Sequence, residues 1–90
     1  MTIAAPETHV SVRALLFAQL RGRFGADELA VSLPCGSTGR DLMRWFAQRN
    51  PKVEDLLSVS RLAVNGEYVS LEQVLKDGDE VVIIPPVSGG

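Results

Sequence analysis

The stretch CGSTGRDLMRWFAQRNP, residues 35–51, decides the fold, because it predicts one helix between two groups of strand-forming residues. Thr38 is followed three residues later by Asp41, which resembles a capping box with Asp in place of Glu or Gln. Apolar residues then recur at the spacing of one helix face, so Trp45 and Phe46 are expected in or beside the core. An Asn-Pro pair ends the helix, since the residue before proline avoids the helical region.

The residues before this helix predict an antiparallel hairpin. The segment HVSVRALLF (9–17) begins with alternating apolar and polar residues and becomes continuously apolar, as a central strand does. The segment ELAVSLP (28–34) alternates throughout, so it is expected to pair with the first strand. Two glycines break the residues between these strands, which are expected to form a short helical turn and a loop.

The residues after the helix predict three more elements. In RLAVNGEYVS (61–70), the Asn65-Gly66 pair favours a hairpin with a type I′ turn, whose two central residues need positive φ. The segment LEQVLKDGDE (71–80) is expected to begin as a short helical turn and to break at its Asp-Gly pair. The segment VVIIP (81–85) is the last predicted strand.

This order of elements predicts an α+β domain with a mixed sheet of four or five strands packed on one main helix. That arrangement is the β-grasp, or ubiquitin-like, pattern. The expected organisation is a flexible N-terminal arm at 1–8, the β-grasp domain at 9–86 and an extended Gly-Gly tail at 87–90.

Composition narrows the class of protein. The net charge of −2 disfavours nucleic acid as the main partner. The N-terminus lacks the pattern of a signal peptide, and the longest apolar run, 81–87, is far shorter than the roughly 20 residues that span a bilayer. The single cysteine, Cys35, has no partner for an internal disulfide, which favours a reducing compartment. These features predict a cytoplasmic protein that does not bind membranes.

Three segments resemble the small, sulfur-carrying subunits of molybdopterin synthase. They are LLFAQLRGRFG (15–25), AVNGEYV (63–69) and LKDGDEVVIIPPVSGG (75–90), of which the closing part is the most specific. The resemblance covers roughly residues 12–90. The FAQLR segment, the chain length and the Pro-Pro pair fit this family better than the related thiamine-type sulfur carriers, which remain an alternative.

The resemblance implies that the chemistry takes place on Gly90. Its carboxylate would be adenylated by an E1-like partner that uses ATP and Mg, and would then accept sulfur from a donor acting through that partner. The resulting thiocarboxylate would donate sulfur to a cyclic pyranopterin phosphate in the large synthase subunit, within a heterotetramer. The chain itself would be a sulfur-donor subunit without a bound cofactor or metal, and no activity is expected from it in isolation.

The residues before Gly90 are expected to carry it into the partner's active site. The two prolines fix φ and lack N–H donors, so they end the strand and keep the exit extended. Glycine lacks Cβ, so the walls of the partner's site can approach the backbone closely. The expected threading residues are Pro85, Pro86, Val87, Ser88 and Gly89.

The resemblance also implies that the sheet face next to the tail packs on the large subunit, and the apolar positions that match this contact are Phe17, Tyr68 and Ile84. The alternative is that these residues belong to the core. Val82 and Ile84 are expected to alternate, one facing the helix and the other the partner.

Four charged residues complete the expected interface. Arg21 is expected either to pair with an acidic group of the partner or to be simply exposed. The acidic residues Asp77, Asp79 and Glu80 are expected to steer the tail onto a basic activating enzyme, the alternative being a solvated turn.

Other functions fit parts of the sequence. A ubiquitin-like protein modifier would use the same activation chemistry, and a ubiquitin-like interaction module would need no free Gly-Gly end. Cys35 precedes a helix, where a thiol can become nucleophilic, but a turn cysteine is the simpler interpretation. His9 alone does not predict a metal site, since zinc needs three or four ligands.

Overall fold

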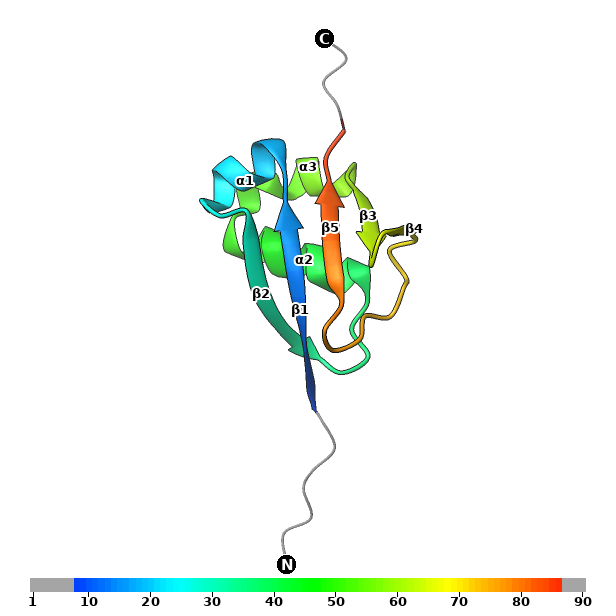
Figure 1. The fold of residues 1–90 in the computed structure, drawn as a ribbon. Helices are drawn as coiled ribbons and strands as arrows, with labels where there is room; N and C mark the ends of the chain where they lie inside the picture. The colour runs from blue at the N-terminus through cyan, green and yellow to red at the C-terminus, as the bar shows by residue number, and fades with distance from the viewer. Residues whose placement is uncertain (1–7, 87–90) are drawn as a thin grey trace, which may run out of the picture.

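Five strands form one mixed sheet in the computed structural model, which describes residues 8–86 (Figure 1). No helix within this range is long and apolar enough to cross a membrane. The strands are β1 (His9–Leu16), β2 (Glu28–Pro34), β3 (Arg61–Val64), β4 (Glu67–Val69) and β5 (Glu80–Ile84). The helices are α1 (Ala18–Phe24), α2 (Gly39–Arg49), the 3₁₀ turn η1 (Pro51–Val53) and α3 (Glu54–Ser58).

The last strand lies at the centre of the sheet. The strand order is β2-β1-β5-β3-β4, in which β5 runs parallel to β1 and antiparallel to β3. The other two pairs, β1–β2 and β3–β4, are antiparallel hairpins. This mixed sheet with its main helix is the β-grasp fold, as the sequence predicts.

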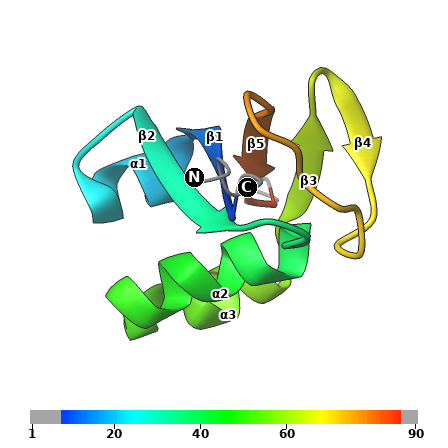
Figure 2. The same cartoon turned by 90° about the horizontal axis from the view of Figure 1, so that it is seen from below.

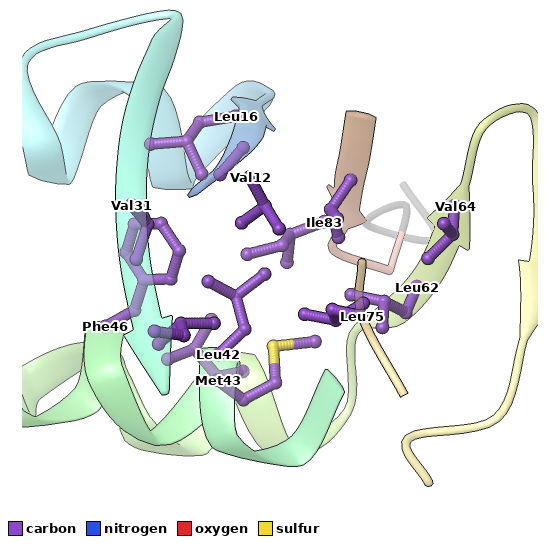
Figure 3. Close-up of a cluster of buried hydrophobic side chains, with 14 of the residues drawn as sticks. Val12, Leu16, Val31, Leu42, Met43, Phe46, Leu62, Val64, Leu75 and Ile83 are labelled. Atoms are coloured by element: carbon purple, nitrogen blue, oxygen red, sulfur yellow. The ribbon is translucent and has the colours of Figure 1, made fainter. Parts of the chain in front are cut away.

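The core lies between the sheet and helix α2. Alternate strand residues such as Val12, Val31 and Ile83 point toward the fully buried Leu42 and Phe46 of α2 (Figure 3). Figure 2 shows α2 and α3 together on one side of the sheet. The opposite side, called the outer face below, is therefore not covered by these two helices.

Local signals in the sequence are confirmed at two places. The Thr38 side chain accepts a hydrogen bond from the Asp41 N–H, and the Asp41 carboxylate accepts one from the Thr38 N–H, which completes the capping box of α2. Asn65 and Gly66 join β3 to β4 with φ values of 50° and 89°. The predicted turn with two left-handed residues is therefore present.

The helical turn predicted at the start of residues 71–80 is wrong. These residues form turns and a single bridge between Val74 and Thr38. The carbonyl oxygens of Leu71 and Gln73 accept hydrogen bonds from the first N–H groups of α2. They therefore do not serve as the acceptors of a helical turn within residues 71–80. The short helix lies instead at α3, which the sequence analysis missed and which buries Leu57.

Removing the capping box should destabilise α2. Replacing Thr38 with Ala is expected to lower the free energy of unfolding by about 1 kcal/mol, because the N–H of Asp41 loses its acceptor. Chemical denaturation at neutral pH measures this change. Thr38→Ser is the matched control, since it keeps the hydroxyl and should lie close to wild type.

The same box should give a defined pH dependence. The hydrogen bond from the Thr38 N–H lowers the pKa of the Asp41 carboxyl below its ordinary value. A lowered folded-state pKa means that the ionised carboxylate stabilises the fold above the unfolded pKa, and that this contribution is lost as pH falls through the folded value. The stability difference between wild type and Asp41→Asn should therefore shrink from neutral pH to about pH 3. A difference that is independent of pH would contradict this assignment.

Candidate functional site

The end of β5 positions the segment that carries the predicted chemistry. The alternating burial of β5 continues past the strand, with Ile83 and Pro85 buried and Pro86 exposed. Because β5 is held by hydrogen bonds on both sides, its direction fixes the direction in which the chain leaves the sheet. Figure 1 shows α1 and α3 at this same end of the sheet.

Most of the predicted tail lies outside the described residues. The residues outside the description are 1–7, which belong to the expected N-terminal arm, and the four tail residues Val87, Ser88, Gly89 and Gly90. The roles given to these four residues stay predictions. The described chain ends at Pro86, the second of the two prolines, and neither proline is part of β5.

A row of apolar residues crosses the outer face of the sheet beside the exit of β5. Directly paired residues have their side chains on the same face, and Val82 is paired with Leu15 on one side and Ala63 on the other. Ala63 is in turn paired with Tyr68. Together with Ile84, these residues form what we call the apolar face: Leu15, Ala63, Tyr68, Val82 and Ile84.

The expectation that Val82 and Ile84 face opposite sides is wrong. They are two residues apart in a strand, and side chains alternate with a period of two, so both lie on the outer face. Both are half-buried, whereas Val81 and Ile83 are fully buried on the helix side. The correction enlarges the apolar surface beside the tail, because neither residue is used in the core.

Phe17 lies next to this face. Its backbone is extended, with φ −124° and ψ 159°, so it continues the alternation of β1 past the buried Leu16. The parallel register pairs Leu16 with Ile83, which places Phe17 level with Ile84. The Phe17 side chain is 49% exposed and Tyr68 is 66% exposed, so neither belongs to the buried core.

Charged residues border the apolar face. The guanidinium carbon of Arg61 lies 5.0 Å from the centroid of the Tyr68 ring. Arg13 lies two residues before Leu15 on β1, and it forms ion pairs with Glu80 and, at 3.7 Å, with Glu28. The hydrogen bond to Glu80, followed by the charge of Glu28, raises the pKa of Arg13. The border therefore has both signs of charge, as the rim of a docking surface often does.

The acidic stretch lies at the other end of β5. Glu80 begins the strand, whereas the tail follows its last residue. Asp77 accepts a hydrogen bond from the Ser11 N–H at 2.7 Å, and Asp79 accepts from the Lys76 N–H at 2.8 Å and from the Asn65 side chain at 2.9 Å. These carboxylates therefore hold the turn before β5, in addition to any role toward a partner.

Two further candidates are not part of the apolar face. Arg21 lies on α1 and forms an exposed ion pair with Asp27 at 3.6 Å. Cys35 is an exposed free cysteine in the turn after β2. The first N–H groups of α2, on Gly39 and Arg40, donate to backbone carbonyls of the 70–75 loop. Those donors are therefore already used and are not directed at the Cys35 sulfur.

The chain is similar in sequence to a known family and to proteins of known name. The ThiS family matches residues 14–90 of the chain. A molybdopterin synthase sulfur carrier subunit from Dictyostelium discoideum is 43% identical, over 87% of this chain and 94% of that protein.

Two solved structures extend the comparison. A putative molybdopterin converting factor, subunit 1, from Pyrococcus furiosus has a TM-score of 0.78 and 37% identity, over 87% of this chain and 99% of that one. The small archaeal modifier protein 1 from Methanosarcina acetivorans has a TM-score of 0.77 and 29% identity, over 91% of this chain and 98% of that one.

Proposed function

The chain belongs to the ThiS family, among the molybdopterin synthase sulfur carrier subunits, and from this premise we propose that it carries sulfur as a thiocarboxylate on Gly90. The observation that supports the proposal most directly is the position of β5. The strand is central, leaves the sheet beside an uncovered apolar face and continues through two prolines toward Gly90. The family match extends to the same residue.

The proposed chemistry has three steps. The Gly90 carboxylate attacks the α-phosphate of ATP on an E1-like enzyme, and pyrophosphate leaves. A persulfide sulfur donor that acts through this enzyme then attacks the acyl carbon, AMP leaves, and an acyl disulfide forms. A thiol then attacks the donor's sulfur in that disulfide, which releases the thiocarboxylate and leaves the donor and the thiol joined as a disulfide. The thiocarboxylate sulfur attacks a carbon of the cyclic pyranopterin phosphate held by the large subunit, and the phosphate oxygen on that carbon leaves as the ring of the cyclic phosphate opens. Hydrolysis of the acyl–sulfur bond then leaves the sulfur on the pterin and returns the Gly90 carboxylate.

In this mechanism the domain positions the reacting group and supplies no catalytic side chain. The large subunit would dock on the apolar face, with Phe17, Tyr68 and Ile84 in the contact. Burying a partly exposed apolar row gives the association its driving force. The same face, lying beside the exit of β5, would aim the tail into the partner's active site.

Intact-mass spectrometry tests the proposal. The full chain is incubated with the activating enzyme, ATP, Mg and a sulfur donor, and is then mixed with the large subunit and the pterin precursor. Replacement of one oxygen by sulfur, followed by loss of that sulfur as the pterin is converted, is the expected result. Sulfur retained on Cys35, with the C-terminus unmodified, would overturn the proposal.

A second function, protein modification, is favoured by the similarity to small archaeal modifier protein 1. The same acyl adenylate would then react with a lysine amine and form an isopeptide bond. Blots of cell lysates distinguish the two functions. Discrete adducts of higher mass that survive reductant indicate a modifier, whereas a thiocarboxylate without adducts indicates a dedicated carrier.

Steering by the acidic stretch stays a prediction and has its own test. Replacing Asp77, Asp79 and Glu80 with their amides should slow adenylation at low salt and reduce its salt dependence, because exposed charges act over about 8–10 Å at physiological salt. Asp77→Asn alone should lower thermal stability slightly, since it weakens the acceptor of the Ser11 N–H. Unchanged adenylation kinetics in the triple variant would leave these residues with only their structural role.

A further inference from the structure

The edge strand β2 has a row of backbone hydrogen-bonding groups that no other described strand uses. In an antiparallel pair, alternate residues direct their N–H and C=O groups toward the neighbouring strand. The hydrogen bonds from the Leu16 N–H to the Asp27 carbonyl and from the Cys35 N–H to the Thr8 carbonyl fix this pattern for residues 27–35. The odd-numbered residues of this range direct their backbone N–H and C=O groups toward β1. The N–H and C=O groups of Ala30 and Ser32 therefore point away from β1, at the free edge of the sheet.

This edge has few of the features that block pairing with another chain. Edge strands are usually protected by an internal proline, a lysine or a bulge. The segment from Glu28 to Ser32 contains no proline or lysine, and Pro34 stands only at the end of the strand. The register with β1 is unbroken from His9 to Leu15, which excludes a bulge there.

A hollow lies between this strand and helix α2. Its volume is about 480 Å³, large enough for side chains of a bound peptide. The strand side includes Leu33 and Pro34, and the helix side includes Arg44, Trp45 and Gln48. In an added strand, alternate side chains would point to the helix side of the sheet, where this hollow lies.

We propose that the edge of β2 binds an extended peptide segment of a partner protein, which adds a sixth strand to the sheet. The peptide backbone would pair with Ala30 and Ser32. Its apolar side chains would enter the hollow beside Trp45. This mode of binding combines main-chain hydrogen bonds for affinity with a side-chain pocket for specificity.

The charges beside the hollow indicate an acidic peptide. Arg44 is an exposed cation that forms an ion pair with Asp41 at 3.4 Å. The guanidinium of Arg49 stacks on the Trp45 ring at 3.5 Å. Arg44 and Asp41 line the hollow, and Arg49, which does not line it, adds a second cation beside it through its contact with the Trp45 ring. Carboxylates flanking the apolar side chains of the peptide would complement these two cations.

A second folded copy fits the site less well. If two β2 strands paired with each other, their side chains on the helix side would be Leu29, Val31 and Leu33. Val31 and Leu33 are already buried in the core of their own domain, at 0% and 4% exposure. They would not be available to fill the hollow, whereas the side chains of an extended peptide would.

Binding at this edge would leave the apolar face free. β1 separates β2 from β5, and the Leu15–Val82 row lies on the outer face, whereas the hollow lies on the helix side. The inference therefore does not depend on the proposed sulfur-carrier function. It predicts that a peptide and the large subunit can bind at the same time.

Nuclear magnetic resonance on the full chain tests the proposal. The probe is the octapeptide acetyl-DDVIVLDD-amide, and the control is acetyl-KKVIVLKK-amide. The acidic peptide should slow amide hydrogen exchange at Ala30 and Ser32, whose N–H groups are free, and should leave Val31 little changed, since its N–H already faces β1. The basic peptide should bind about tenfold more weakly.

Two variants make the test specific. Ser32→Pro removes one outward N–H without cutting the ladder to β1, and should weaken binding of the acidic peptide about tenfold. Arg44→Glu, which leaves the backbone intact, should reverse the preference so that the basic peptide binds more tightly. Shifts confined to Leu15 and Val82, or no change at Ala30 and Ser32 at millimolar peptide, would overturn the proposal. So would slowed exchange at Ala30 that depends only on protein concentration, since it would indicate a second copy.

Discussion

Deleting Gly90 is expected to abolish pterin conversion by the assembled synthase while leaving the folded domain intact. The deletion withdraws the reactive carbon by about 3.5 Å, and adding one residue after Gly90 advances it by the same distance. A misplacement of about 1 Å can already cost roughly a hundredfold in rate, so either change should reduce turnover by at least that factor. The buried core is built from residues 10–83, so the free energy of unfolding should be unchanged.

Two matched variants separate position from chemistry. Gly90→Ala keeps the chain length and should be milder than either the deletion or the insertion, because only a methyl group is added near the acyl carbon. Cys35→Ala removes the thiol and should transfer sulfur at close to the normal rate. Sulfur incorporation is read by intact mass, and turnover by conversion of the pterin precursor. Full conversion by the deletion variant, or its loss in Cys35→Ala, would contradict the proposed mechanism.

Replacing Ile84 with Asp is expected to weaken association with the large subunit by about 2–4 kcal/mol, which is roughly 30- to 1,000-fold in affinity. Ile84 lies in the apolar face beside the exit of β5, so docking would bury the new carboxylate without a partner. Phe17→Asp should have a comparable effect, because Phe17 is level with Ile84 and half-exposed. Titration calorimetry with the large subunit measures both variants.

The matched control is Val74→Asp. Val74 is also an exposed apolar residue, at 47%, but it bridges to Thr38 at the start of α2, away from the apolar face. The Val74→Asp variant should therefore bind the large subunit with the affinity of the wild type. Ile84 is half-buried, so thermal unfolding must first show that the Ile84→Asp variant is folded at the assay temperature. Phe17 is more exposed, so the Phe17→Asp variant tests the same contact with less risk of unfolding the domain. Normal affinity in both folded variants would remove these residues from the interface.

The two largest predictions concern different parts of one site. The Gly90 variants test the position of the reacting carboxylate, and the Ile84 and Phe17 variants test the contact that docks the domain on the large subunit. A variant that binds the large subunit normally but does not transfer sulfur would show that docking and positioning of the carboxylate are separate roles. The β2 edge would be independent of both, since it lies on another strand and on the helix side of the sheet.

Some features were determined by the sequence because they depend on neighbours along the chain. The positive φ of Asn65 and Gly66 follows from what these two residues can adopt in a tight turn, and the box of Thr38 and Asp41 spans a single helical turn. The alternation within β2 and the helical spacing within α2 are likewise local. Together with the family resemblance they were sufficient to predict the β-grasp fold.

Other features were decided only by the tertiary structure, because they depend on residues far apart in the chain. The parallel pairing of β1 with β5 brings Leu15 beside Val82, and it alone places Phe17 level with Ile84. The loop at 71–75 lost its predicted helical turn because its carbonyls bind the N-terminus of α2. The free edge of β2 likewise exists only because the sheet ends there. Local preference selects the elements, whereas long-range hydrogen bonds and burial decide which faces and edges remain available to partners.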